Sequence, residues 1–269
     1  MTRSGIPAPQ PATTPDQPKT DDRLLDIRDL RLTFGNVTAL NGVTMHADAG
    51  EVTAIIGDNG AGKSSLTKCV LGVHRPTGGT MSFRGEEVTV TSPQHAKELG
   101  IEAVFQDLAL FDDLKLWQNM FIGRELKKGV GPFSLLRKKD MAARADTMVR
   151  ALTVNTPDVQ RTVRSMSGGQ RQAVAIARAV AWGSELVIMD EPTAALGLRE
   201  RTEVEESILD LRRQHRSFLL ISHSFDQVMR LADAVWVMRQ GRAVAHRRIS
   251  ETSGQELVAL VTGAQEAEL

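Results

Sequence analysis

The stretch Val52-Thr53-Ala54-Ile55-Ile56-Gly57-Asp58-Asn59-Gly60-Ala61-Gly62-Lys63-Ser64 decides the fold. Residues 52–56 predict a buried strand, and residues 63–71 have the spacing of a helix that stops at Gly72. Between them, Gly57–Ser64 fits the phosphate-loop pattern. In such a loop, glycines bring backbone N–H groups close to phosphate oxygens, and the following helix points its positive end at them. The stretch therefore predicts an α/β nucleotide-binding protein.

The phosphate loop supplies the first candidate site residues. Lys63 would neutralise the outer phosphates, and the Ser64 hydroxyl would bind a Mg²⁺ ion that bridges the same oxygens. The alternative, a glycine turn before an ordinary helix, fits the strand-to-helix context less well. The predicted nucleotide contacts are Gly57, Asp58, Asn59, Gly60, Ala61, Gly62, Lys63, Ser64 and Ser65.

A second run, Ser167-Gly168-Gly169-Gln170-Arg171-Gln172, makes the prediction more specific. Ser167 is predicted to cap a helix that begins near Gln170, and Gly168 and Gly169 would expose N–H groups to an anion. A capping serine with two glycines is also common for structural reasons alone. Because the match extends to Arg178 and accompanies a phosphate loop, the chain resembles the ATP-binding-cassette (ABC) family, which has such a signature run.

This resemblance implies ATP as the ligand and a second copy of the chain as a partner. In ABC proteins the signature run is held away from the phosphate loop of its own chain and contacts the nucleotide bound by a second subunit. One chain would then carry two half-sites and no complete site. Ser167, Gly168, Gly169 and Gln170 would contact the ATP of the partner.

Two carboxylates, Asp190 and Glu191, follow the apolar strand predicted at residues 186–189. Asp190 would hold Mg²⁺ through a water, and Glu191 would polarise the attacking water as the general base that phosphoryl transfer requires. Two acidic residues at a strand end are more often a solvated turn when they stand alone. Their position after the phosphate loop and the signature run favours the catalytic interpretation.

Three more site residues are assigned from the resemblance. His223 follows the buried strand predicted at residues 218–221, so it emerges at the carboxyl edge of the sheet and resembles the switch histidine that contacts the γ-phosphate. Gln106 matches the glutamine loop, which touches the metal and the water. Phe34 stands where the family stacks an aromatic ring on adenine, with a core phenylalanine as the alternative. The other histidines are interpreted as surface or structural: His46, His74, His95, His215 and His246.

The predicted architecture is α/β. A mainly parallel sheet of the P-loop NTPase type is flanked by helices, with an N-terminal antiparallel β subdomain and a helical insertion that carries the signature run. One ABC ATPase domain is expected at 23–263, with its helical subdomain at about 107–180. Residues 1–22 are expected to form a disordered, proline-rich lead-in, and residues 264–269 a C-terminal tail.

The remaining elements are predicted from periodicity, caps and turns. The antiparallel subdomain is expected to contain extended segments at 24–34, 43–46, 81–83 and 87–90. Helices are expected at 93–99, between Ser92 and Gly100, and at 139–152, 171–182 and 200–214. Residues 235–238 and 243–245 predict a hairpin, and Ser253 with Glu256 predicts a capping box for a last short helix.

Composition excludes several classes of function. The chain has 269 residues with 33 basic and 33 acidic side chains, so its formal net charge of +0 gives no general attraction to nucleic acid. Its single cysteine, Cys69, cannot form an internal disulfide, which fits a reducing cytoplasm. No apolar stretch approaches the roughly 20 residues needed to cross a bilayer, and no signal peptide is recognised.

Within the ABC family, four runs most resemble cassettes of bacterial monosaccharide importers: residues 57–60, 92–101, 105–110 and 191–197. Such importers take up sugars such as ribose, xylose or fructose. Each motif occurs once and no internal repeat is present, so a homodimer is implied. Gly197 departs from the wider family, which usually has aspartate there, at a loop expected to cross the dimer interface.

The resemblance also implies partners and a location. Polytopic membrane permease subunits would dock near residues 106–123 and hold the chain at the cytoplasmic face of the bacterial inner membrane, and a sugar-binding protein would act indirectly. Phe111, Leu114, Trp117 and Phe121 would either offer an apolar docking surface or form the core of the helical subdomain. Two alternatives stay open: an importer for another cargo such as an amino acid or a lipid, and a non-transport ABC ATPase.

Overall fold

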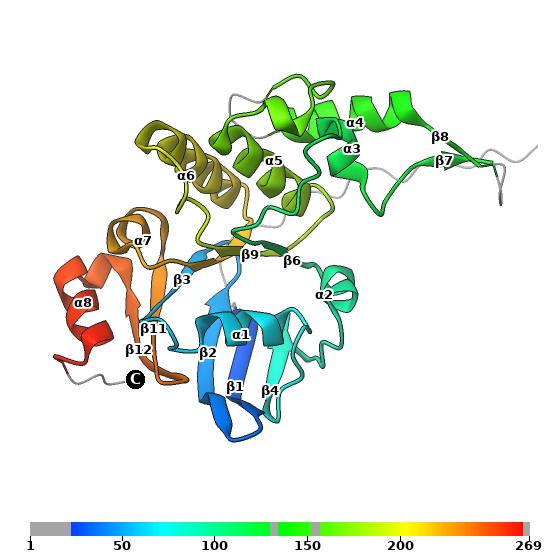
Figure 1. Cartoon of the computed structure of the whole chain (residues 1–269). Coiled ribbons are helices and arrows are strands. Elements are labelled where there is room, and N and C mark those ends of the chain that lie inside the picture. The colour runs from blue at the N-terminus through cyan, green and yellow to red at the C-terminus, as the bar shows by residue number, and fades with distance from the viewer. Residues whose placement is uncertain (1–22, 130–133, 152–156, 266–269) are drawn as a thin grey trace, which may run out of the picture.

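The computed structural model describes residues 23–129, 134–151 and 157–265, in which two sheets and a helical region are arranged as Figure 1 shows. The predicted lead-in, residue 152 of one predicted helix and most of the predicted tail lie outside these residues. The first sheet is antiparallel, in the order β2-β1-β4-β5. Its strands are β1 (Arg23–Phe34), β2 (Val37–Asp48), β4 (Gly78–Phe83) and β5 (Glu86–Glu87).

This first sheet confirms the predicted antiparallel part, with two differences in length. β2 begins at Val37, well before the predicted start at Val43, because β1 and β2 pair along almost their whole length. The predicted strand at 87–90 is wrong beyond Glu87. There the chain makes one more bond, from Val88 N–H to the Met81 carbonyl, and then leaves the sheet toward Ser92, the cap of the next helix.

The second sheet is mainly parallel, as predicted, in the order β12-β11-β3-β10-β9-β6. Almost every residue of its central strands is buried, because helices and the first sheet cover it on both faces. Only β12, which pairs with β11, is antiparallel. The strands are β3 (Val52–Ile56), β6 (Ile101–Val104), β9 (Leu186–Asp190), β10 (Ser217–Ile221), β11 (Ala234–Arg239) and β12 (Arg242–Arg248).

Helices connect the parallel strands and form a separate region around the signature run (Figure 1). In that region α3, α4 and α5 pack together, and a small hairpin, β7 with β8, projects from it. The hairpin and α7 were not predicted. The elements are α1 (Lys63–Val70), α2 (Pro93–Leu99), α3 (Leu116–Phe121), β7 (Lys127–Lys128), β8 (Leu135–Leu136), α4 (Lys138–Arg150), α5 (Gly168–Val180), α6 (Leu198–Arg213), α7 (Phe225–Leu231) and α8 (Gly254–Thr262).

Helix ends follow the predicted caps closely. The Ser92 hydroxyl accepts a bond from His95 N–H at the start of α2, and Gly100 ends that helix in the left-handed region. At α8, Ser253 caps as predicted, but the capping box is wrong. The Glu256 carboxylate instead binds Arg247 Nε at 2.9 Å and the Thr252 hydroxyl at 2.8 Å, where a charged partner outcompetes a backbone N–H.

Three distant segments enclose the phosphate loop. Gly57 lies so close to the turn after β11 that a Cβ there would come 2.2 Å from the Met238 carbonyl oxygen. Gly241, in the turn between β11 and β12, donates its N–H to the Ala61 carbonyl at 3.0 Å and accepts a bond from Asn41 N–H at 2.7 Å. The first sheet and the C-terminal hairpin therefore fix the shape of the loop together.

Candidate nucleotide site

The predicted site residues leave the parallel sheet at one edge. The phosphate loop follows β3, His223 follows β10, Asp190 and Glu191 end β9, and Gln106 follows β6. These four strands are neighbours in the sheet, and their register places Ile55, Ile221 and Asp190 at the same level. Because the carboxyl ends of parallel strands meet at such an edge, the topology brings together side chains from four separate parts of the sequence.

The phosphate loop is preshaped around Lys63. Gly62, the N-cap of α1, has φ 103°, a left-handed conformation that glycine adopts readily. The Lys63 ammonium donates to the carbonyls of Gly57 at 2.5 Å and Asp58 at 3.0 Å. Burial lowers the pKa of Lys63, and the charges of Glu191 and Asp190 oppose that effect. Asp58, Asn59, Gly60 and the predicted metal ligand Ser64 are exposed.

Glu191 and His223 form the closest contact of the site. Glu191 Oε1 lies 2.6 Å from His223 Nδ1 and accepts the backbone N–H of His223 at 2.9 Å. Glu191 itself has φ 51°, an uncommon conformation for a residue with a Cβ, and its N–H donates to the Ile221 carbonyl. The strained backbone thus aims one carboxylate oxygen at the histidine from the neighbouring strand.

Asp190 is half-buried beside this pair. Burial raises the pKa of the Asp190 carboxyl, and the neighbouring Glu191 charge raises it further, while Lys63 and Lys68 act in the opposite direction. A cation at this position would relieve the cost of two adjacent carboxylates. The oxygen donors of Ser64, Asp190 and the exposed Gln106 suit Mg²⁺, which usually takes few protein ligands and keeps several waters.

A buried polar network supports the Glu191–His223 pair, and the sequence did not reveal it. Gln227 of α7 accepts a bond from the Ser222 hydroxyl at 2.9 Å and donates to the Thr193 hydroxyl at 2.6 Å. Ser222 precedes His223 and Thr193 follows Glu191 by two residues, so one amide joins the two loops. Glu205 completes the network through paired bonds from Arg230, both at 2.9 Å.

The signature run lies in the helical region, at the start of α5. Ser167 and Gln170 form a full capping box, with Ser167 Oγ accepting Gln170 N–H at 3.4 Å and Gln170 Oε1 accepting Ser167 N–H at 3.2 Å. The helix begins at Gly168, two residues before the predicted start. Within the part of the chain that the structure describes, no hydrogen bond or ion pair joins residues 167–170 to the phosphate loop.

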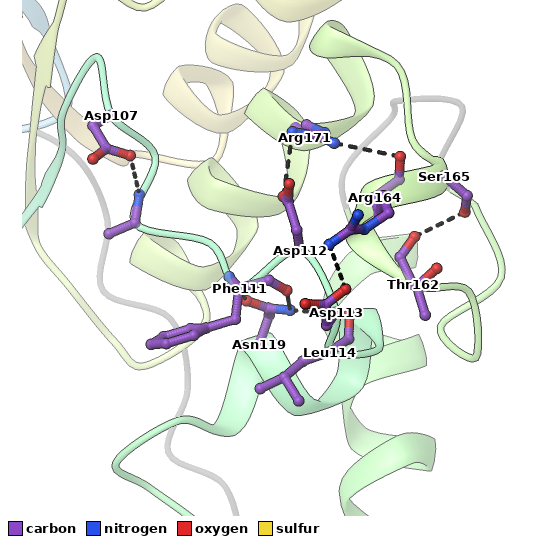
Figure 2. Close-up of polar contacts among 11 residues, drawn as sticks. Asp107, Phe111, Asp112, Asp113, Leu114, Asn119, Thr162, Arg164, Ser165 and Arg171 are labelled. Carbon is purple, nitrogen blue, oxygen red and sulfur yellow. Dashed lines mark hydrogen bonds and ion pairs between the residues drawn. The ribbon is translucent and has the colours of Figure 1, made fainter.

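A set of polar contacts ties the segment after Gln106 to the signature helix (Figure 2). Arg171 of α5 pairs with Asp112 at 3.3 Å, and Arg164, just before the run, pairs with Asp113 at 2.6 Å. The fully buried Asn119 holds the same segment by bonding both the N–H and the carbonyl of Phe111. Arg178 further along α5 donates to the carbonyls of Leu108 and Ala109, each at 2.8 Å.

An apolar groove of about 400 Å³ lies beside this segment, between α2, β6, α3 and α5. Phe105, Phe111 and Ile122 are exposed large apolar side chains along it. Of the residues predicted for docking or core, Trp117 and Phe121 are buried and belong to the core, whereas Phe111 is 56% exposed. The two interpretations therefore both apply, to different residues of the group.

The aromatic candidate and the other histidines lie as follows. Phe34 is 47% exposed, and its ring meets the edge of His74 at 5.0 Å, which contradicts the core alternative. His46 and His246 pack with Trp236 between the two sheets, and burial lowers the pKa of His246 to about 4. His46 and His246 are therefore structural, as predicted.

Comparisons with known proteins identify the family. Residues 40–194 match the ABC transporter family. The xylose/arabinose import ATP-binding protein of Sulfolobus acidocaldarius is 41% identical, with 89% of this chain and 94% of that protein covered. The fructose import ATP-binding protein of Rhizobium meliloti is also 41% identical, with 90% and 95% covered. The chain belongs to the ABC transporter family and is an ATP-binding subunit with ATPase activity.

Other relatives and solved structures agree with this assignment. A ribose import ATP-binding protein of Jannaschia is 39% identical, but this chain spans only 46% of its length. A nucleotide-free ATP-binding cassette from an ABC transporter superposes with a TM-score of 0.77 at 26% identity, covering 88% of this chain and 95% of that one. Among the described residues, no helix is long and apolar enough to span a membrane.

Proposed function

We propose that this chain energises the import of a monosaccharide by hydrolysing ATP, with the contact between Glu191 and His223 as the observation that carries the catalytic assignment. The 2.6 Å contact holds a carboxylate at the sheet edge beside the phosphate loop, where a general base for the attacking water is needed. The cargo is inferred from the relatives, whose names specify import of xylose or arabinose, fructose and ribose.

In the proposed reaction, each residue of the edge has one task. Glu191 accepts the proton of the attacking water, and His223 orients that water and contacts the γ-phosphate. Lys63 leaves the Gly57 and Asp58 carbonyls to neutralise the outer phosphates. Ser64, Asp190 and Gln106 would hold Mg²⁺, which supplies positive charge against the phosphate oxygens. Phe34, being exposed, is free to stack on adenine.

The proposed working unit is a homodimer with two shared sites. Each ATP would contact the phosphate loop, Gly57–Ser65, of one copy and the signature residues Ser167–Gln170 of the other. The separation of these segments within the described residues supports this arrangement, since the signature residues have no contact with their own loop. Loss of the γ-phosphate would then remove the contact that bridges the copies and reopen the dimer.

The proposed membrane partner is a polytopic permease that docks in the apolar groove near residues 106–123. The exposed Phe105, Phe111 and Ile122 suit an apolar helix of the partner. The contacts in Figure 2 would connect that groove to the signature helix. The chain would thereby sit at the cytoplasmic face of a bacterial inner membrane, and a sugar-binding protein would act through the permease.

Reconstitution tests this function. The purified chain, combined with its permease in proteoliposomes, should hydrolyse ATP faster when sugar-loaded binding protein is added. An amino-acid or lipid cargo that stimulates in place of sugars would overturn the monosaccharide assignment. A chain that hydrolyses ATP at the same rate with and without permease, and does not bind it, would overturn the transport assignment and favour a non-transport ATPase.

A further inference from the structure

An acidic side chain of this same chain lies against the signature run. Glu200 stands in the first turn of α6. A Cβ built on Gly169 would lie 3.0 Å from Glu200 Cβ and 3.3 Å from its Cγ, and one on Gly168 would lie 3.5 Å from its Oε2. The two signature glycines therefore allow Glu200 to approach, and its carboxylate lies at the amino-terminal end of α5.

The partners of this carboxylate are all hydrogen-bond donors. The Ser167 hydroxyl and the N–H of Gly169 donate to it, and so does the N–H of Gly197 at the start of its own helix. These bonds lower the pKa of Glu200, so the group is charged at neutral pH. The carboxylate bridges the amino-terminal ends of α5 and α6, where unpaired N–H groups and the helix dipoles stabilise a negative charge.

Ser167 and Gly169 are also the donors assigned to the γ-phosphate of the partner's ATP. A hydroxyl or an N–H has one hydrogen, so neither group can donate fully to Glu200 and to a phosphate at once. The two anions would also repel each other at this short range. The nucleotide can therefore engage the signature run only if the Glu200 carboxylate moves away.

We infer that Glu200 is a positioning residue that occupies the signature donors in the nucleotide-free chain, and that its displacement raises the ATP concentration needed for two chains to close. This inference rests on the proposed shared site. Displacement is sterically open, because Glu200 is only partly buried and a Cβ on the neighbouring Gly197 would meet nothing within 4 Å. The remaining bond to Gly197 N–H would keep α6 capped after the carboxylate leaves α5.

The experiment measures ATP-driven dimerisation of the full-length chain in a Glu191→Gln background, which is expected to bind ATP without hydrolysing it. Glu200→Gln keeps the size of the side chain and removes its charge. We expect it to lower the ATP concentration at half-maximal dimer by about threefold or more, since the amide competes less well for a helix terminus. Glu203→Gln, one turn further along α6 and paired with Arg199, is the matched control and should leave that concentration unchanged.

The outcomes separate this inference from the proposed function. If the Glu191→Gln parent stays monomeric at every ATP concentration, the shared site fails and this inference fails with it. If the parent dimerises but Glu200→Gln needs as much ATP or more, only the inference is overturned, and Glu200 supports the signature run instead. As a second measurement, amide hydrogen exchange at residues 168–170 of the nucleotide-free chain should be faster in Glu200→Gln; equal exchange would also contradict the inference.

Discussion

The phosphate loop and the signature run are both prepared for phosphate, but by different internal partners. At the loop, the Lys63 ammonium binds two neutral backbone carbonyls. At the signature run, the Ser167 hydroxyl and Gly169 N–H bind a charged carboxylate from the next helix. Neutral partners give way to a phosphate at small cost, whereas a charged partner competes with it. The comparison suggests that binding to one chain is easy and that closure of two chains is the controlled step.

The largest effect should come from the base on the phosphate-loop side. Glu191→Gln removes the proton acceptor but keeps an oxygen for His223, so kcat should fall about 10²–10⁴-fold while ATP still binds. Single-turnover hydrolysis and binding of a fluorescent ATP analogue measure the two quantities. Turnover near that of the unaltered chain would show that another group is the base. Glu203→Gln, outside the site, controls for charge loss.

Mixing two defective chains tests whether the two regions really belong to different copies. Lys63→Ala should abolish phosphate binding at the loop, and Ser167→Ala should reduce turnover by roughly tenfold through loss of one bond to a charged group. In a mixed dimer, one site carries both defects and the other carries none. ATPase activity of the mixture should therefore exceed that of either variant alone; no gain at any mixing ratio would contradict shared sites.

The polar network behind the phosphate-loop side should have an intermediate effect. Gln227→Leu leaves the hydroxyls of Ser222 and Thr193 without their buried partner, which should destabilise the chain by about 1–3 kcal/mol. Because the same amide aligns the loops of Glu191 and His223, kcat should fall more than KM changes. Gln94→Leu, an exposed glutamine bound to Glu98, is the control and should shift stability by less than about 0.5 kcal/mol. A pure stability loss with unchanged kcat would deny the positioning role.

The smallest effect concerns the stability cost of the metal site. Burial and Glu191 raise the pKa of Asp190 above its unfolded value, so the ionised carboxylate costs folding free energy above the folded pKa. Asp190→Asn should stabilise the nucleotide-free chain at neutral pH by about 0.5 kcal/mol, a small value because solvent screens the half-exposed group. The gain should disappear as the pH falls through the folded pKa of Asp190 toward its ordinary value. Calorimetry across this range checks it, and a lower Tm for the variant would contradict it.

Sequence reasoning recovered the features that depend on local chemistry. The strand, loop and helix around Lys63 follow from hydrophobic pattern and glycine placement, and the caps at Ser92 and Ser167 follow from side-chain bonding within one turn. Gln227 and Glu200 escaped because their roles depend on which helices pack together. A glutamine in α7 and a glutamate in α6 look like ordinary helix residues until the fold brings Thr193 and Gly169 to them.

The same reasoning explains the errors of length and cap. β2 continues to Val37 because its partner β1 extends that far, and pairing across strands is not visible in either strand alone. The expected box at Ser253 fails because Arg247, on the preceding strand, binds Glu256 more strongly than a backbone N–H would. In each case a tertiary contact overrides a local preference.

The bond from Gly241 to the carbonyl of Ala61 has a consequence for the order of synthesis. The phosphate loop is translated early, but one of the segments that shapes it, the turn between β11 and β12, is translated near the end. A ribosome-bound chain that stops before Gly241 has every residue of the loop and none of this support. Competence to bind nucleotide therefore arrives late, after both the catalytic carboxylate and the signature run have been made, so an unfinished subunit holds no ATP and cannot capture a partner prematurely.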